Sequence, residues 1–252
     1  MFLSLPTSTD KFTDWSWSQI EPYYHELSAR PLMAQNVNLW LADWSQLRKL
    51  LTETYNRLYV AITVDTADAK AEGRYNNFLE HIFPRSQAAE QVLKEKLLSS
   101  GVEPEGFLVP LRNLRAEAAL FRETNLPLLA GELKLSNEYD KITSSQTVEW
   151  QGKELTLQQL LPVYQDPDRD TRERAWRLAA ARQLQDRQAI NDLWVRLMNL
   201  RGDLAINAQM ITQAGQPDYR AYRWQQLLRL DYTPHDCVRF QQAIKQVAVP
   251  AA

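Results

Sequence analysis

Residues 36–64 read NVNLWLADWSQLRKLLTETYNRLYVAITV. Apolar and aromatic side chains recur there every three or four residues, and this spacing places them on one face of a helix. Asn36 belongs to the residue types that begin helices well, because its side chain can accept a hydrogen bond from a free backbone amide. The segment therefore predicts one long amphipathic helix with an aromatic-rich buried face.

The chain before this segment predicts a lead-in and one further helix. Residues 1–13 show no helical periodicity, and we expect an extended segment there. A first helix should follow Asp14 and end at Pro31, because proline lacks the amide hydrogen that a helix interior needs.

The chain after this segment predicts a second helical arm. Asp65 or Thr66 is expected to cap it. Pro84 should break it, and Gly101 should end it, since glycine readily adopts the left-handed conformation that closes helices. Together with residues 36–64, this arm predicts a long helical hairpin.

The remaining chain is also predicted to be mostly helical. The expected helices cover 111–123, 126–144, a very long segment beginning at Asp166-Pro167 and reaching Ala208 or beyond, a short one capped by Asp218 after Gly215 and Pro217, and a last one started by Thr233, Pro234 and Asp236. If the last helix lacks partner helices, Phe240, Ile244 and Val247 should expose apolar surface.

One segment, TVEWQGKELTL from Thr147 to Leu157, alternates apolar and polar residues as the strands of a β-hairpin do. A turn at Gly152-Lys153 would pair Trp150 with Leu155 and put the apolar residues on one face. A turn at Gln151-Gly152 would instead place two glutamates opposite each other. We therefore expect the first register.

These patterns predict an all-α fold: a long helical hairpin and a helical bundle, with one small β-hairpin at about Thr147–Leu157. We expect three regions. Residues 1–110 form the helical hairpin region, residues 111–212 form a helical domain carrying the β-hairpin, and residues 213–252 begin a further region.

Composition limits the partners. The 252 residues carry a net charge of −2, so no overall basic excess attracts nucleic acid or an anionic membrane. No stretch approaches the roughly 20 apolar residues of a spanning helix. Cys237 is the single cysteine, which favours a reducing compartment. We expect a cytoplasmic protein that binds neither nucleic acid nor membrane.

No complete metal site is predicted. His25-Glu26-Leu27-Ser28-Ala29 begins like the zinc-helix motif H-E-x-x-H, but Ala29 stands where the second histidine is required. His235 and Cys237 are two residues apart and would point in different directions on a helix. The third histidine, His81, has no motif around it.

Catalytic and nucleic-acid sites are also not predicted. Cys237 lies near a helix start, which lowers a thiol pKa, but no convincing base accompanies it. The arginines between Arg169 and Arg187 alternate with acids, a pattern typical of a solvated helix face. Aromatic residues between Tyr219 and Arg229 could stack on bases, but their helical spacing favours core packing. No residue is assigned a catalytic or metal-binding role.

Four stretches together resemble a known family. They are LRNLRAEAALFRE (111–123), TVEWQGKELTL (147–157), PVYQDPDRDTRERAWRLAA (162–180) and PDYRAYRWQQLLRLDYTPHDC (217–237). They are similar to the N-terminal half of oligoendopeptidase F-like zinc metallopeptidases, the relatives of thimet oligopeptidase. The resemblance runs from about Val37 to the last residue.

The resemblance implies a helical peptidase with a deep channel for unstructured oligopeptides. It also implies zinc held by H-E-x-x-H and a later glutamate, with the first glutamate activating water. None of these residues occurs here, so the resemblance implies a non-catalytic channel wall and, from about Pro217, the beginning of the catalytic half. We expect this chain alone to bind no zinc and cleave no peptide. Two alternatives are a stand-alone helical scaffold that binds peptides or proteins, and an RNA-binding protein that uses its arginine helix.

Overall fold

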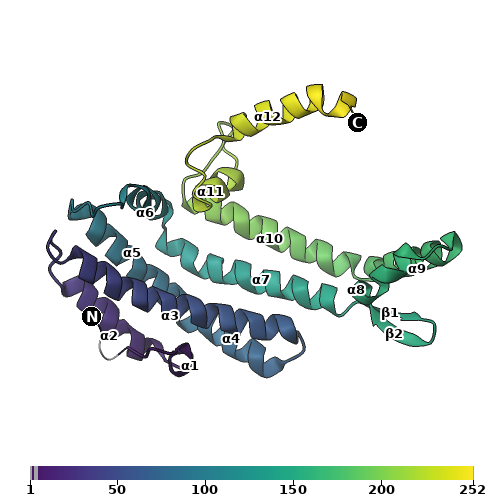
Figure 1. Cartoon of the computed structure of the whole chain (residues 1–252), viewed down its shortest axis with the longest axis horizontal. Coiled ribbons are helices and arrows are strands. Elements are labelled where there is room, and N and C mark those ends of the chain that lie inside the picture. The colour runs from purple at the N-terminus through teal and green to yellow at the C-terminus, as the bar shows by residue number, and fades with distance from the viewer. Residues whose placement is uncertain (1, 3–4, 252) are drawn as a thin grey trace.

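The computed structural model describes residues 2 and 5–251. Helices dominate it, and a single two-stranded antiparallel sheet interrupts them (Figure 1), which confirms the all-α fold with one small β-hairpin. The elements are α1 (Thr9–Phe12), α2 (Trp17–Ala29), α3 (Val37–Val64), α4 (Ala69–His81), α5 (Phe83–Ser99), α6 (Leu108–Leu120), η1 (Glu123–Asn125), α7 (Leu126–Ser144), β1 (Thr147–Trp150), β2 (Lys153–Thr156), α8 (Leu157–Leu160), η2 (Leu161–Gln165), α9 (Arg169–Gln185), α10 (Arg187–Asn207), α11 (Tyr219–Gln226), α12 (Pro234–Val247) and η3 (Val249–Ala251).

The largest hydrophobic core lies among α2, α3, α4 and α5. The predicted long helix is α3, and its aromatic face is buried there through Trp40 and Trp44. Asn36 precedes α3, but its side chain does not cap it. Its Oδ1 instead accepts from the Met33 amide at 2.9 Å, and its amide group donates to the Pro31 carbonyl at 2.7 Å.

The second arm of the hairpin begins three residues later than Asp65. Asp68 caps α4, because its Oδ1 accepts from the amides of Lys70 and Ala71 at 2.8 and 3.0 Å. Asp65 instead ends α3. The break at Pro84 is confirmed, since α4 ends at His81 and α5 begins at Phe83.

The end at Gly101 agrees with the sequence-based expectation, whereas the lead-in and α6 differ from it in detail. Gly101 follows α5 with a φ of +67°, as a helix-ending glycine should. The lead-in is not wholly extended, because Ser8 caps the single helical turn α1. Helix α6 begins and ends three residues earlier than expected, since the backbone turns extended at Phe121.

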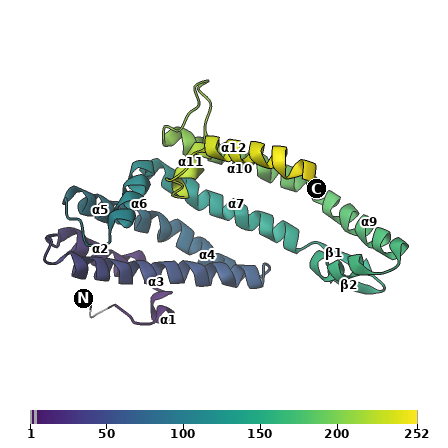
Figure 2. The ribbon, with the colours of Figure 1, turned by 45° about the horizontal axis from the view of Figure 1, so that its top comes forward.

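A second layer is built on α7 and α10, which lie side by side along much of their length (Figures 1 and 2). Helix α11 packs at one end of this pair, where a smaller core gathers Leu120, Leu204 and Tyr222. At the other end, the β-hairpin, α8 and α9 enclose a third core around Val148, Leu160 and Ala175.

The very long helix expected from Asp166-Pro167 onward is two helices. Asp168, not Asp166, caps the first, by accepting from the amides of Asp170 and Thr171. The helix is interrupted at Asp186, whose φ and ψ are −91° and 3°. The Asp186 carboxylate accepts from Gln146 at 2.8 Å and from Arg182 at 2.6 Å. The break between the two helices is therefore accompanied by a contact with Gln146, the residue before β1. Local sequence does not reveal such a contact.

The expected hairpin register is wrong. Val148 pairs with Leu155 and Glu149 with Glu154, so the turn lies at Gln151-Gly152. Both turn residues have positive φ, +52° and +76°, the conformation whose twist matches a two-residue hairpin. The opposed glutamates are solvent-exposed, so their repulsion is screened.

The start of the next helix explains why Leu157 is not part of the β-hairpin. Thr156 begins α8 through a capping box with Gln159. Leu157 is therefore helical and is not available to extend β2.

The last helix stands away from the rest of the molecule (Figure 1). Thr233 caps α12 through a capping box with Asp236, as predicted. Helix α12 has no buried residue, and Phe240, Ile244 and Val247 are exposed, which confirms the expected apolar surface. Among the described residues, no helix is both long and apolar enough to cross a membrane.

Candidate functional site

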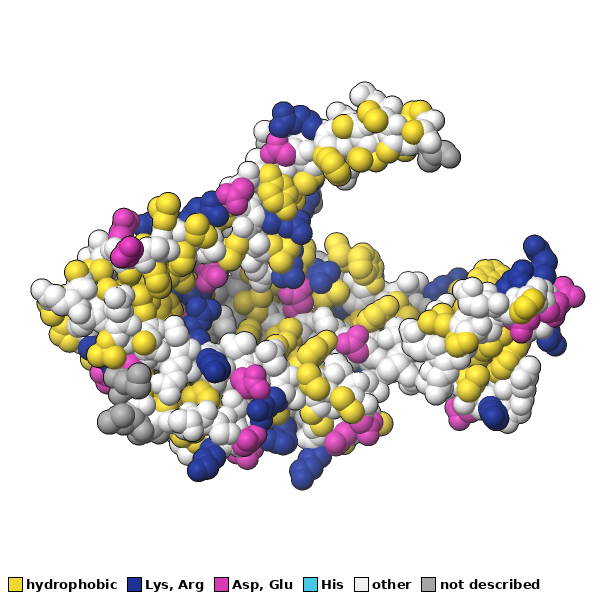
Figure 3. Space-filling model, in the orientation of Figure 1, with side chains coloured by type: hydrophobic (Ala, Val, Ile, Leu, Met, Phe, Trp, Pro, Cys, Tyr) yellow, Lys and Arg dark blue, Asp and Glu magenta, His cyan; other side chains and the backbone are white. Residues whose placement is uncertain are grey.

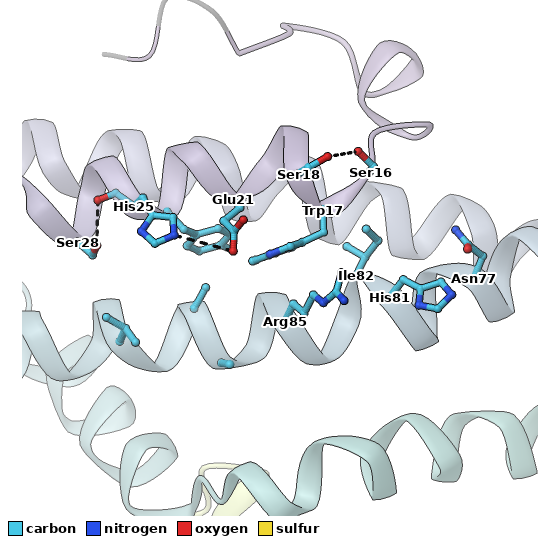
Figure 4. A pocket seen from close by; sticks show the side chains of 14 residues that line it. Ser16, Trp17, Ser18, Glu21, His25, Ser28, Asn77, His81, Ile82 and Arg85 are labelled. Atoms are coloured by element: carbon cyan, nitrogen blue, oxygen red, sulfur yellow. Dashed lines mark hydrogen bonds and ion pairs between the residues drawn. The ribbon is translucent and has the colours of Figure 1, made fainter.

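Two surface features could carry function: a groove beside α2 and an apolar recess beside α12. The groove has a volume of about 930 Å³ and is lined by α2, the C-terminal part of α4, and α5 (Figure 4). We call it the α2–α5 groove. His25 and His81, two of the three histidines, both line it.

The histidines do not make a metal site. His25 Nε2 lies 3.9 Å from Glu21 Oε1, and His81 Nε2 lies 3.9 Å from Glu80 Oε2, so each has one acidic neighbour. Ala29, at the position of the missing ligand, is the last residue of α2. The part of the chain that the structure describes holds no group of three metal-ligating side chains. A zinc ion takes at least three protein ligands, so these residues do not fit it.

His235 and Cys237 both lie in the first turn of α12, away from the groove. Cys237 is half-buried and free. The structure brings neither residue to another histidine or to an acidic cluster able to hold a metal, within residues 2 and 5–251.

Most arginines of α9 are held in local contacts. Arg177 pairs with Glu173 at 2.7 Å, and Arg172 donates to the carbonyls of Asp166 and Pro167. Arg174 lies over the ring of Trp150, 5.7 Å from its centroid. These contacts lie within α9 or join it to the residues just before it and to the β-hairpin.

The aromatic segment from Tyr219 to Arg229 builds a junction between helices. Tyr222 is buried, and Tyr219 stacks on it with ring centroids 5.8 Å apart. Glu132 of α7 accepts from the Tyr219 hydroxyl at 2.9 Å and from Arg201 of α10 at 2.8 Å. Burial and the nearby Glu132 carboxylate raise the pKa of Tyr219 to about 12. This segment therefore fixes α11 to α7 and α10.

The apolar recess lies between α12 and the body of the molecule. Figure 3 shows hydrophobic side chains along α12, including the side that faces the hollow. Phe240 is 67% exposed and Val247 is 73% exposed. On α10, Trp194 is 58% exposed and Met198 is also exposed. Apolar faces of two helices are thus left without a covering layer, which marks an interaction surface.

Sequence reasoning missed the α2–α5 groove and a buried acid beneath it. Glu90 of α5 is buried, and burial raises the pKa of its carboxyl. Its Oε1 accepts from the Tyr24 hydroxyl at 2.6 Å, and its Oε2 accepts from Trp44 Nε1 at 2.9 Å. For Glu90, the only signal in the sequence was an acidic residue on the apolar side of a helical pattern. The groove had no signal, because it depends on how α2 and α5 meet.

No family model and no curated protein matches this chain. Three solved structures are similar to it. A putative oligoendopeptidase F is 22% identical, with a TM-score of 0.83 over 93% of this chain and 41% of that one. A putative oligoendopeptidase F from Bacillus anthracis is 18% identical, with a TM-score of 0.84 over 94% of this chain and 44% of that one. PZ peptidase A, solved with an inhibitor, is 21% identical, with a TM-score of 0.79 over 99% of this chain and 44% of that one.

At these identities the similarity establishes the fold. The chain spans less than half the length of each similar structure. This chain therefore has the fold of part of an oligoendopeptidase F-like peptidase.

Proposed function

We propose that this chain is the N-terminal, non-catalytic part of a zinc-dependent oligopeptidase. In this proposal, residues 1–110 and 111–212 form one wall of a channel for short unstructured peptides, and residues 213–252 begin the catalytic half. The zinc ligands belong to the remainder of the protein, since the residues described here do not fit the ion.

One observation supports this proposal most strongly: the uncovered apolar face of α12, in a chain that matches 41–44% of the similar peptidases. A well-capped amphipathic helix with no buried residue gains little from hydrophobic burial in this chain alone. A further helical layer seated in the recess would bury Phe240, Val247 and the exposed side chains of α10.

The first experiment uses the purified chain. We expect no chelator-sensitive cleavage of a quenched fluorescent oligopeptide and no stoichiometric zinc by elemental analysis. Zinc-dependent cleavage by residues 1–252 alone would overturn the assignment of a non-catalytic part.

The second experiment uses the gene. An H-E-x-x-H sequence within about a hundred codons after Ala252, on the scale of one domain, would support the proposal. The longer protein should then cleave the same peptide, and 1,10-phenanthroline should abolish the cleavage. A stop codon directly after Ala252 would instead favour a stand-alone binding scaffold.

A further inference from the structure

The α2–α5 groove follows two helices that run side by side in the same direction. Tyr24 of α2 contacts Glu90 of α5, and further along Lys96 donates to the carbonyl of Ser28. The groove is lined by α2 and the residue before it, from Ser16 to Ser28. Twelve residues of α-helix rise about 18 Å, so the groove is elongated along the helices. Its length suits a third helix of about three turns, laid between the first two.

The floor of the groove is apolar and made mostly of small side chains. Helix α5 contributes Ala88, Ala89 and Val92, and Val92 is 51% exposed. Small residues let another helix approach closely. Helix α2 contributes Trp17, which is half-buried and stacks on Tyr24 with ring centroids 5.8 Å apart. A leucine-like side chain entering the groove would thus meet an aromatic ring and an aliphatic floor.

The groove carries one guanidinium, from Arg85 of α5, and one carboxylate, from Glu21 of α2. Arg85 extends toward Trp17 from α5 (Figure 4), and it forms no salt bridge with any residue that the structure describes. His81, the last residue of α4, also lines the groove, and Glu21 lies beside His25 on α2. By contrast, Arg48 pairs with Glu90. An unpaired guanidinium beside an apolar floor complements a carboxylate on the edge of an apolar stripe.

We propose that the α2–α5 groove is a docking site for an acidic amphipathic helix of a partner protein. The partner places apolar residues at helical spacing on Trp17, Ala89 and Val92, and a glutamate or aspartate beside that stripe pairs with Arg85. The groove lies within residues 1–110, which the proposed function assigns to the channel wall, but the inference does not depend on that function, because it rests on the groove's own side chains and not on zinc or on the recess.

A second copy of this chain is a poorer occupant. One exposed amphipathic helix it could offer is α12, which carries Arg239 and Lys245 against the single acid Asp236. A basic helix would set like charges against Arg85.

The test uses two synthetic 14-residue helices with blocked ends. Both carry leucines at i, i+4, i+7 and i+11. One carries glutamates beside the leucine stripe, and its twin carries lysines at the same positions. Fluorescence anisotropy with the purified chain should give at least about tenfold tighter binding of the glutamate helix, as expected for a charge-assisted pair at a partly desolvated site. Arg85→Glu should reverse this preference.

Three variants separate the groove from other surfaces. Arg187→Glu changes an exposed arginine on α10, for which no ion pair is found among the described residues, and should leave the preference unchanged. Val92→Asp, at an exposed position of the floor, should weaken binding of the glutamate helix at least about tenfold without lowering the melting temperature. The pair Phe240→Ser and Ile244→Ser removes the apolar face of α12 and should also leave the preference unchanged.

Several results would overturn the proposal. They are an Arg85→Glu protein that still prefers the glutamate helix, a Val92→Asp protein that binds it as tightly as the wild type, and a loss of preference in Arg187→Glu. A concentration-dependent dimer in analytical ultracentrifugation that Val92→Asp dissociates would assign the groove to a second copy.

Discussion

The hydroxyl of Tyr24 donates to the carboxylate of Glu90 at 2.6 Å in the interior of the helical hairpin region. The same carboxylate accepts from Trp44 at 2.9 Å, and Arg48 lies 3.3 Å away. One acid on α5 therefore joins α2 and α3 beneath the α2–α5 groove. It supplies acceptors for donors that would otherwise be buried without partners.

Glu90→Ala should destabilise the protein by about 2–4 kcal/mol, because it leaves the Tyr24, Trp44 and Arg48 donors without their acceptor. Glu90→Gln keeps one amide oxygen and should cost less. Urea unfolding followed by circular dichroism measures both. Equal stability of wild type and Glu90→Ala would show that water replaces the carboxylate at no cost.

The same residue predicts a pH dependence. Burial raises the pKa of Glu90 in the folded protein above its ordinary value of 4.5, although Arg48 opposes this. Between the unfolded and folded pKa values, the folded state binds more protons than the unfolded state. The stabilisation that Glu90 contributes is therefore fully present at pH values below its pKa in the unfolded state. It is lost as the pH rises through the pKa of Glu90 in the folded state.

The measurement compares wild type with Glu90→Gln, which cannot titrate at this position. As pH rises above about 4.5, the wild type should lose stability relative to the variant. A difference in unfolding free energy that stays constant from pH 4 to pH 8 would contradict a raised pKa.

The hairpin turn predicts opposite effects for two neighbouring substitutions. Gly152→Ala should destabilise the protein by about 1 kcal/mol, because φ is +76° there. No atom lies within 4 Å of the added Cβ, so the cost is conformational. Gln151→Asn should stabilise the turn, since asparagine tolerates its φ of +52° better. Thermal unfolding of both variants decides this, and a destabilising Gln151→Asn would argue for the other register.

Glu132 and Glu138 form a matched pair on α7. Glu132 is largely buried between Arg201 and Tyr219, whereas Glu138 pairs with Arg196 in a half-exposed bridge. Glu132→Ala should cost about 1–3 kcal/mol and speed amide exchange across α11, because two partly buried donors lose their acceptor. Glu138→Ala should cost less than about 1 kcal/mol. Similar costs for the two variants would show that the junction contributes no more than a surface pair.

The apolar face of α12 predicts a result that depends on the length of the protein. In residues 1–252, Phe240→Ser with Ile244→Ser should change the unfolding free energy by less than about 0.5 kcal/mol, because both side chains are exposed. In a longer protein with a catalytic half, the same pair should impair folding and peptide cleavage, because the side chains are then buried. A large loss of stability in residues 1–252 would show that α12 packs on this chain.

Local sequence predicted the features whose causes are local. Pro84 interrupts the second arm because it lacks an amide hydrogen, and Gly101 ends it with a left-handed conformation. Asp218 and Thr233 cap their helices with side chains three residues from the amides they bind. These contacts lie within one turn of helix, so the same residues favour them before any tertiary structure forms.

Predictions were wrong where two local signals competed or where the deciding contact was remote. Asp65, Thr66 and Asp68 can all begin a helix, and Asp68 does so. The turn conformation at Gln151-Gly152 outweighed the pairing of exposed glutamates. The break at Asp186 is accompanied by a hydrogen bond from Gln146, forty residues earlier.

The sequence by itself determined an all-α protein with a β-hairpin, several of its helix boundaries, the amphipathic character of α12 and the lack of an H-E-x-x-H motif, because these depend on composition, periodicity and neighbouring residues. Only the tertiary structure decided the buried Glu90 network, the break at Asp186 and the α2–α5 groove, because each depends on segments at least 40 residues apart meeting in space. The groove is the clearest case: Trp17 and Arg85 share a surface only after α2 packs beside α5.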